Sequence, residues 1–167
     1  MQHSFSLLVE NAPGVLSRVA GLIARRGYNI ESLTVSATQS PRYSRMTIVM
    51  AGDDAVLEQV GKQLNKLVEV LRVWDITDRA LSRELALIRV AAPQALRREL
   101  LALAQAYRAT PVDFSREAIV LEVTGSAGKV NAFLEILKDY EVQEIVRTGT
   151  VALERGRLEK MLIEKED

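Results

Sequence analysis

Residues 3–26 read HSFSLLVENAPGVLSRVAGLIARR, and this stretch decides the fold. In residues 3–10 apolar side chains alternate with serines, which is the period-two pattern of a β-strand. The Asn-Ala-Pro-Gly run at 11–14 is a turn signal. From 14 to 26 the apolar residues recur at helical spacing, and Gly27 fits a left-handed helix stop. The stretch therefore predicts a strand, a turn and a helix.

The same rules extend the pattern as far as residue 76. Alternating residues predict strands at 33–37 and 43–51. The Gly-Asp-Asp run at 52–54 predicts a helix start, because aspartate there accepts hydrogen bonds from free backbone N–H groups. A strand at 68–76 follows that helix. The resulting β-α-β-β-α-β order is the ferredoxin-like arrangement, in which two helices cover one face of a four-stranded antiparallel sheet.

The second half repeats this order without repeating the sequence. Pro93 is expected at the first position of a helix, and Ser126 is expected to cap the next helix. The strands of this half are predicted at 84–91, 112–115, 118–124 and 142–153. The predicted fold class is therefore α+β, with two tandem ferredoxin-like βαββαβ units, each an antiparallel sheet with its helices on one face.

A polar step at 77–79 marks the expected domain boundary. It divides the chain into a first domain of residues 1–77 and a second of residues 78–167. The second domain ends in a tail at 154–167, whose alternating charges predict a short solvated helix or a frayed end. Only the first domain carries the Asn-Ala-Pro-Gly turn.

Composition excludes several classes of protein. The 167 residues include 22 Lys and Arg, 22 Asp and Glu, one His and no Cys. Such a chain forms no disulfide, thiolate nucleophile, cysteine-ligated zinc or multi-histidine site. Zero net charge argues against a nucleic-acid-binding protein. Neither a membrane span of about 18 apolar residues nor a basic secretory signal is present, so we expect a cytoplasmic protein without membrane contact.

No group of residues predicts catalysis. His3 stands alone and is expected on the surface of an edge strand. The carboxylates at 53–54 fit a helix cap better than acid–base chemistry. Gly-Ser-Ala-Gly at 125–128 fits a turn and a cap better than an anion site, and it matches no phosphate-binding loop. The arginine pairs at 25–26 and 97–98 are expected on solvated helix faces.

One feature suggests binding of a small ligand. The turn at 11–14 joins a strand to a helix, whose first N–H groups attract a carboxylate. Gly14 has no side chain, so a ligand can approach the backbone closely, and Asn11 can donate and accept hydrogen bonds. Asn29 and Ile30 begin the next strand, which this fold can place near the same loop of a second subunit. A tight turn with no ligand is an equally good interpretation of the residues alone.

The loop resembles the effector loop of ACT domains, and Tyr28-Asn29-Ile30 resembles the start of their second strand. The whole chain is similar to a narrower family, the small regulatory subunits of acetohydroxyacid synthase (acetolactate synthase). Four stretches from both halves carry the resemblance: NAPGVLSRVAGL (11–22), RGYNIESL (26–33), RELALIRV (83–90) and RTGTVALERG (147–156).

This resemblance implies a chain that is not catalytic itself and carries no cofactor or metal. Its partner would be a large catalytic subunit, which uses thiamine diphosphate, Mg²⁺ and usually FAD to condense pyruvate with a second 2-ketoacid. Binding would activate that subunit and confer feedback inhibition by valine, in branched-chain amino-acid biosynthesis. The implied valine site lies between the ACT domains of a homodimer, at Asn11, Gly14, Val15, Leu16, Asn29 and Ile30.

Two other functions stay open at this point. The chain could be a stand-alone ACT-type amino-acid sensor that regulates another enzyme or transcription. It could also be a small enzyme on a ferredoxin-like scaffold, although one His, no Cys and no clustered acids argue against that. The residues do not distinguish valine from leucine or isoleucine, which differ from it by one carbon, about 1–3 kcal/mol of discrimination at most.

Overall fold

The computed structural model describes residues 2–156, apart from the side chain of Val56, and its contacts divide the chain into two compact units. The first unit runs to Leu81 and includes the chain again at residues 152–156. The second unit is Ser82–Val151. The sequence analysis placed the boundary at 77–79 and predicted no return to the first unit. Most of the predicted tail, residues 157–167, lies outside the described residues.

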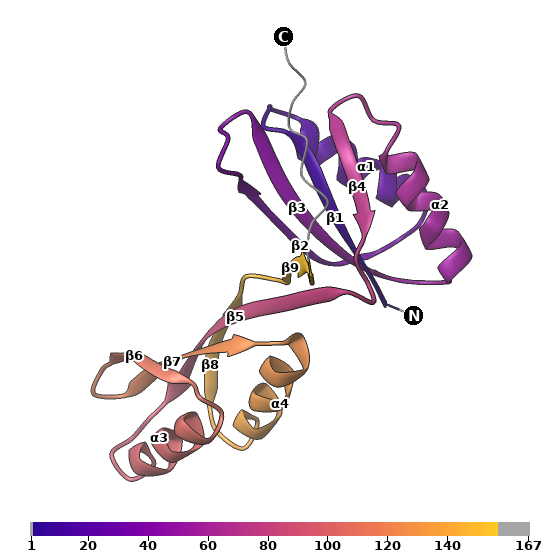
Figure 1. Ribbon diagram of the computed structural model, residues 1–167. Helices are drawn as coiled ribbons and strands as arrows, with labels where there is room; N and C mark the ends of the chain where they lie inside the picture. Colours follow the sequence, from indigo (N-terminus) through magenta and orange to yellow (C-terminus); the bar gives the residue numbers. More distant parts are fainter. Residues whose placement is uncertain (1, 157–167) are drawn as a thin grey trace. The chain divides into compact units, whose positions relative to one another are not determined.

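The first unit has the predicted β-α-β-β-α-β order (Figure 1). Its strands form one antiparallel sheet in the order β2-β3-β1-β4. Leu7 and Ile48 of the sheet pack in one core with Val19 and Leu57 of the two helices, so both helices cover the same face. The elements are β1 (Gln2–Glu10), α1 (Val15–Arg25), β2 (Ile30–Ala37), β3 (Tyr43–Ala51), α2 (Asp54–Leu64) and β4 (Val70–Asp75).

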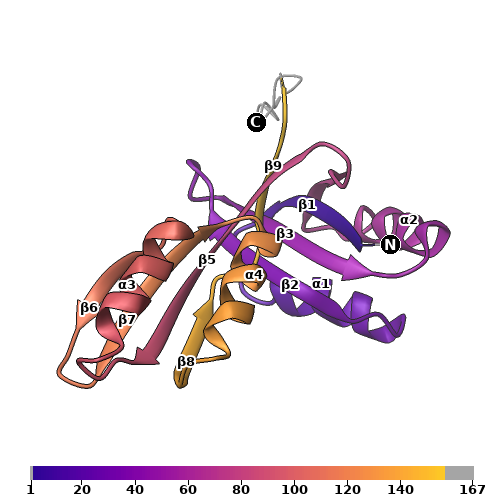
Figure 2. The same cartoon turned by 90° about the horizontal axis from the view of Figure 1, so that it is seen from below.

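The second unit repeats that topology, with the strand order β6-β7-β5-β8 (Figure 2). Ile88 and Leu121 of its sheet pack with Leu100 and Phe133 of its two helices. The elements are β5 (Ala80–Ala91), α3 (Arg97–Ala106), β6 (Thr110–Phe114), β7 (Ala118–Gly125), α4 (Ala127–Leu137) and β8 (Val142–Arg147). The short strand β9 (Val151–Glu154) pairs with β5, and all of it but Val151 belongs to the first unit. The predicted fold class, two tandem ferredoxin-like units, is confirmed.

The predicted helix ends are present in atomic detail. Asp53 Oδ1 accepts a hydrogen bond from Ala55 N at 3.0 Å, and Ser126 Oγ accepts one from Lys129 N at 3.3 Å. Gly27 follows α1 with a φ of 76°, in the left-handed region expected for a helix stop. The acidic residues at 53–54 and the glycine-rich turn at 125–128 therefore begin α2 and α4.

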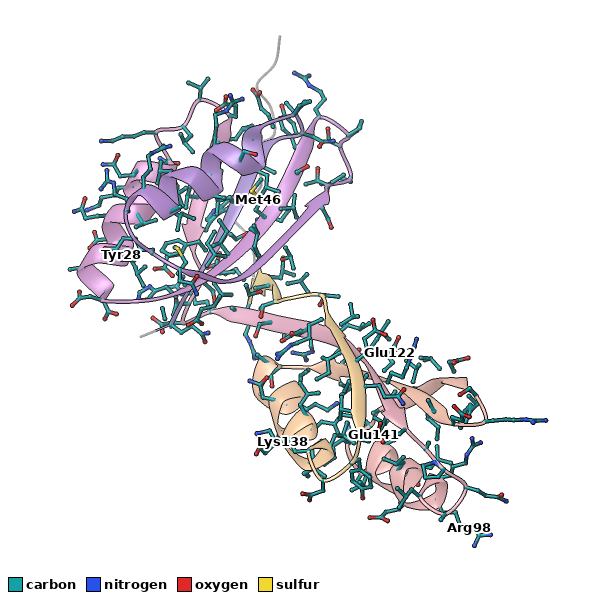
Figure 3. All side chains as sticks on the ribbon, turned by 180° about the vertical axis from the view of Figure 1, so that it is seen from behind. Tyr28, Met46, Arg98, Glu122, Lys138 and Glu141 are labelled. Carbon is teal, nitrogen blue, oxygen red and sulfur yellow. The ribbon has the colours of Figure 1, made fainter. Side chains whose placement is uncertain are left out.

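The prediction that Pro93 begins a helix is wrong, because α3 begins at Arg97. The Pro93 carbonyl accepts a hydrogen bond from Leu96 N at 2.9 Å and closes a turn before the helix. Arg97, predicted on a solvated face, is half-buried and donates from Nε to Ala92 O at 3.0 Å. These bonds hold the chain in a turn where the helix was expected. Arg98 does extend into solvent (Figure 3).

Two predicted strands are shorter than the sequence indicated. The strand expected at 142–153 is two strands, because the chain bends at Gly149, whose φ is 79°. The strand expected from Val68 begins at Val70. Val68 itself lies in the preceding turn and is 91% exposed. In both places the sequence suggested a continuous strand where the backbone turns.

Candidate functional site

The loop between β1 and α1 is tied to the loop between β2 and β3 through Asn11. The backbone N–H of Asn11 donates to Arg42 O at 2.8 Å, and its side-chain Nδ2 donates to Pro41 O at 2.9 Å. Its Oδ1 accepts a hydrogen bond from Ser44 Oγ at 3.1 Å. Asn11 was predicted to contact a ligand. In this structure its side chain holds the loop in place, while the residue stays exposed.

Gly14 precedes α1 with a φ of 84°, a left-handed conformation that residues with a Cβ rarely adopt. No side chain of the described residues caps α1, so its first turn retains N–H groups for an external acceptor. The Val15 side chain is buried, which leaves only its backbone for a ligand, and Val15 N makes a long 3.4 Å bond to Ala12 O. Leu16 is 43% exposed and presents an apolar side chain at the surface.

A cation faces the space that Gly14 leaves open. Nη2 of Arg18 lies 3.7 Å from the position that a Cβ at Gly14 would occupy. The same nitrogen pairs with Glu69 Oε1 at 2.8 Å. The sequence analysis did not include Arg18 or Glu69. The available signal was spacing, because residue i+4 lies on the same face of a helix as residue i.

One chain does not bring the two halves of the predicted site together. Asn29 is exposed and Ile30 packs partly against the core of the first unit. Ile30 pairs with Met50 of β3, whereas Glu10, next to the loop, pairs with Tyr43 at the opposite end of β3. At about 3.3 Å per residue, these ends are roughly 20 Å apart. The six residues therefore form two separate groups within a chain.

His3 forms a polar cluster elsewhere in the first unit. Its Nε2 lies 3.0 Å from Asp54 Oδ1 and its Nδ1 lies 3.2 Å from Asp75 Oδ2. Carboxylates only accept hydrogen bonds, so both contacts form together only when the imidazole carries two protons. The prediction of a solitary surface His on an edge strand is wrong. β1 is a central strand, and the His3 side chain is only 12% exposed.

The surroundings of His3 favour its charged form. The hydrogen bond to Asp54 raises the pKa of His3, burial opposes this, and Asp75 raises it further. Burial alone would raise the pKa of Asp75, but its hydrogen bonds from Thr77 and His3 hold that pKa below the usual value. His3 opens onto a shallow pocket whose other charged lining residues are Asp54, Asp75, Asp78, Arg79 and Glu154. None of the six predicted effector-site residues lines this pocket.

We expect His3 to make the stability of the first unit dependent on pH. Because its folded pKa is raised above 6.5, its stabilisation is complete below pH 6.5 and is lost as pH rises through the folded pKa. The free energy of unfolding of the native chain should exceed that of His3→Gln by about 1 kcal/mol at pH 6 and by progressively less towards pH 8. The expected difference is small because both carboxylates are partly exposed. Urea unfolding of both proteins across this range measures the difference. A difference that does not change with pH would contradict the prediction.

Within residues 2–156, no group of three or more His, Cys, Asp or Glu residues is arranged to hold a metal ion. No helix in that part of the chain is long and apolar enough to cross a membrane.

The first unit, with its Gly14 loop and its sheet order, has the architecture of an ACT domain. Residues 5–72 match the family model described as the AHAS small subunit-like ACT domain. Residues 83–156 match the model described as the small subunit of acetolactate synthase. The chain therefore belongs to the family of acetolactate synthase small subunits.

Similar proteins match over nearly their whole length. The probable acetolactate synthase small subunit of Archaeoglobus fulgidus is 54% identical over 156 residues, covering 93% of this chain and 98% of that protein. The acetolactate synthase small subunit of Bacillus subtilis is 45% identical, covering 96% and 94%. The crystal structure of the Thermotoga maritima small subunit superposes with a TM-score of 0.87 at 42% identity, covering 95% and 99%.

Proposed function

We propose that this chain is a regulatory, non-catalytic subunit of acetohydroxyacid synthase. It binds the large catalytic subunit, raises its activity and makes that activity sensitive to valine. The observation that carries the proposal is the match of both units, residues 5–72 and 83–156, to models of this one family. Thiamine diphosphate, Mg²⁺ and FAD belong to the large subunit, which performs the carboligation of pyruvate. The second unit contributes surface for docking that subunit.

The effector site is completed by a second copy of the chain, paired along β2. This strand lies at one edge of its four-stranded sheet, so its outer side is available to another strand. Antiparallel pairing of two β2 strands about a twofold axis places Ile30 of one copy beside Ala37 of the other. The Gly14 loop lies at the same end of the sheet as Ala37, because Ala37 and Val9 both pair with Ser44. Such a dimer has two equivalent sites.

Each site offers a zwitterion complementary groups. The carboxylate of valine meets the backbone N–H groups at the start of α1, and its ammonium meets the Asn29 oxygen of the partner subunit. Its branched side chain contacts Leu16 and the partner's Ile30. Burial of three aliphatic carbons contributes about 2 kcal/mol. A micromolar to millimolar effector needs only about 4–8 kcal/mol in total, so a few polar contacts complete the affinity.

A mixed dimer tests whether the site spans two chains. We expect Gly14→Asp and Asn29→Ala each to abolish valine binding in a homodimer. In a heterodimer of the two variants, one site carries both substitutions and the other carries neither. The heterodimer should therefore bind one valine with native affinity, measured by calorimetry on chains purified through two different tags.

The control for this experiment is a heterodimer of each variant with the native chain, which should also bind one valine. If the site lay within a single chain, the mixture of Gly14→Asp and Asn29→Ala would bind none. That result, together with one valine in each control, would contradict the two-chain site.

The proposed function itself is tested by a pull-down from cell extract with the tagged full chain, followed by a carboligase assay with and without valine. We expect recovery of a thiamine-diphosphate enzyme whose activity rises on binding and falls with valine. Purified chain that binds valine but recovers no such enzyme would favour a stand-alone ACT-type sensor. Turnover by the purified chain alone would favour an enzyme.

A further inference from the structure

We propose that Arg18 recognises the carboxylate of the effector, and that Glu69 competes with that carboxylate for the same guanidinium. The inference rests on the proposed function, because it concerns the valine site at the Gly14 loop. It adds a residue for effector recognition and an internal competitor, neither of which was among the six residues predicted from the sequence.

The position of Arg18 is the first argument. Its side chain folds back over the start of α1, so that Nη2, Cζ and Nη1 lie 3.7, 3.9 and 4.0 Å from the point where a Gly14 Cβ would stand. A ligand that uses the space left by Gly14 therefore meets a guanidinium. The first N–H groups of α1 and this guanidinium border the same space, and both favour an anion.

The second argument is the exposure of the guanidinium. Arginine has five N–H donors, and Nη2 of Arg18 lies 2.8 Å from Glu69 Oε1. The Arg18 side chain remains 53% exposed. A planar carboxylate can therefore approach a second edge of the fork or replace Glu69 altogether. An exposed ion pair of this kind is weak, so exchange of one carboxylate for another is inexpensive.

The third argument is the position of Glu69. Its carbonyl accepts a hydrogen bond from Glu10 N at 2.9 Å, so the loop between α2 and β4 is fastened to the end of β1, next to the effector loop. Its carboxylate is 21% exposed, less than the arginine that it pairs with. Glu69 thus stays within reach of Arg18 by its backbone attachment and acts as a fixed local competitor for any incoming anion. Its presence sets the effector concentration needed for binding.

The test is calorimetric titration of L-valine into the full-length chain and three variants. Arg18→Gln should raise the Kd for valine about tenfold or more, because a charge-assisted contact is lost. Glu69→Gln should lower the Kd about two- to fivefold, because the competitor is lost. Glu58→Gln removes the acid of the exposed Glu58–Lys62 pair in the same unit and should change the Kd less than twofold.

The distinguishing result is that Arg18→Gln and Glu69→Gln change the Kd for valine in opposite directions. If the ion pair only stabilised the loop, both Arg18→Gln and Glu69→Gln would weaken valine binding. That outcome would overturn the inference, and so would an unchanged Kd in either variant. Thermal melts of every variant identify any loss of folding, and Glu69→Gln keeps the test decisive if Arg18→Gln fails to fold.

A second ligand tests which group of the effector Arg18 contacts. L-Valinamide has a neutral amide in place of the carboxylate, so its Kd should be the same for the native chain and Arg18→Gln. Equal losses for L-valine and L-valinamide would overturn the inference. Failure of the native chain to bind L-valine would overturn the proposed effector itself and this inference with it, whereas native binding with unchanged variants overturns the inference alone.

Discussion

Gly14→Asp is expected to abolish valine inhibition of the assembled enzyme, with a loss of valine affinity of about a hundredfold or more. The Cβ of the new side chain would lie 3.7 Å from Arg18 Nη2, so the carboxylate that it carries is within reach of the guanidinium. It would thereby place a fixed negative charge where the carboxylate of the effector is proposed to bind, and like charges there repel. The φ of 84° adds strain for any residue with a side chain.

The measurement is the valine concentration for half-inhibition, with each variant referred to its own activity without valine. Gly14→Asn is the matched control, because asparagine has nearly the same shape, tolerates a left-handed backbone and carries no charge. We expect a much smaller loss for Gly14→Asn. Equal losses would assign the effect to size and strain, and normal inhibition of the aspartate variant would remove Gly14 from the site.

Arg147→Met is expected to destabilise the second unit by about 2–4 kcal/mol. Glu84 is only 4% exposed, and both of its carboxylate oxygens accept hydrogen bonds from Arg147, one of them from Nη2 at 2.8 Å. The same contact raises the pKa of Arg147. Replacing Arg147 with methionine keeps most of the side-chain volume but leaves a buried carboxylate without its cation. The penalty is desolvation of that charge.

The same two strands provide the control. Arg89 of β5 and Glu144 of β8 form a pair at 3.7 Å whose side chains are 52% and 57% exposed. Glu144→Gln should therefore change the stability by less than about 0.5 kcal/mol. Hydrogen exchange of the β5 and β8 amides reports the second unit separately from the first. Similar losses for the two variants would contradict the role assigned to burial.

Periodicity in the sequence predicted the elements because each unit places its apolar residues on a single face. Leu7 and Val9 alternate along β1, and Val19 and Ile23 recur along α1, so a pattern of hydrophobic residues is enough to locate both. Capping was equally predictable at Asp53 and Ser126, where a short polar side chain accepts a hydrogen bond from a backbone N–H group within the next three residues. Local interactions therefore made most of the secondary-structure elements predictable from the sequence.

The predictions failed where a distant group decides the local structure. Arg97 donates to the carbonyl of Arg116 at 2.7 Å. This partner is 19 residues away, whereas helix propensity depends only on the local sequence. His3 meets Asp54 and Asp75 only after β1, α2 and β4 have assembled. Arg18 and Glu69 are likewise brought together by the first unit as a whole. Such pairs join residues far apart in sequence, and their side chains are too common to stand out in a single chain.

The return of the chain to the first unit has a consequence for biosynthesis. Residues 152–156 belong with the unit that includes Leu81, and Arg155 N donates to Arg79 O at 2.8 Å. The second unit is thus an insertion within the first. During translation the second unit can be completed on the ribosome before the first, because residues 152–156 of the first unit are synthesised after the whole of residues 82–151. A truncated chain that stops at residue 81 omits that segment, whereas a shortened chain that joins residue 81 to residue 152 retains it.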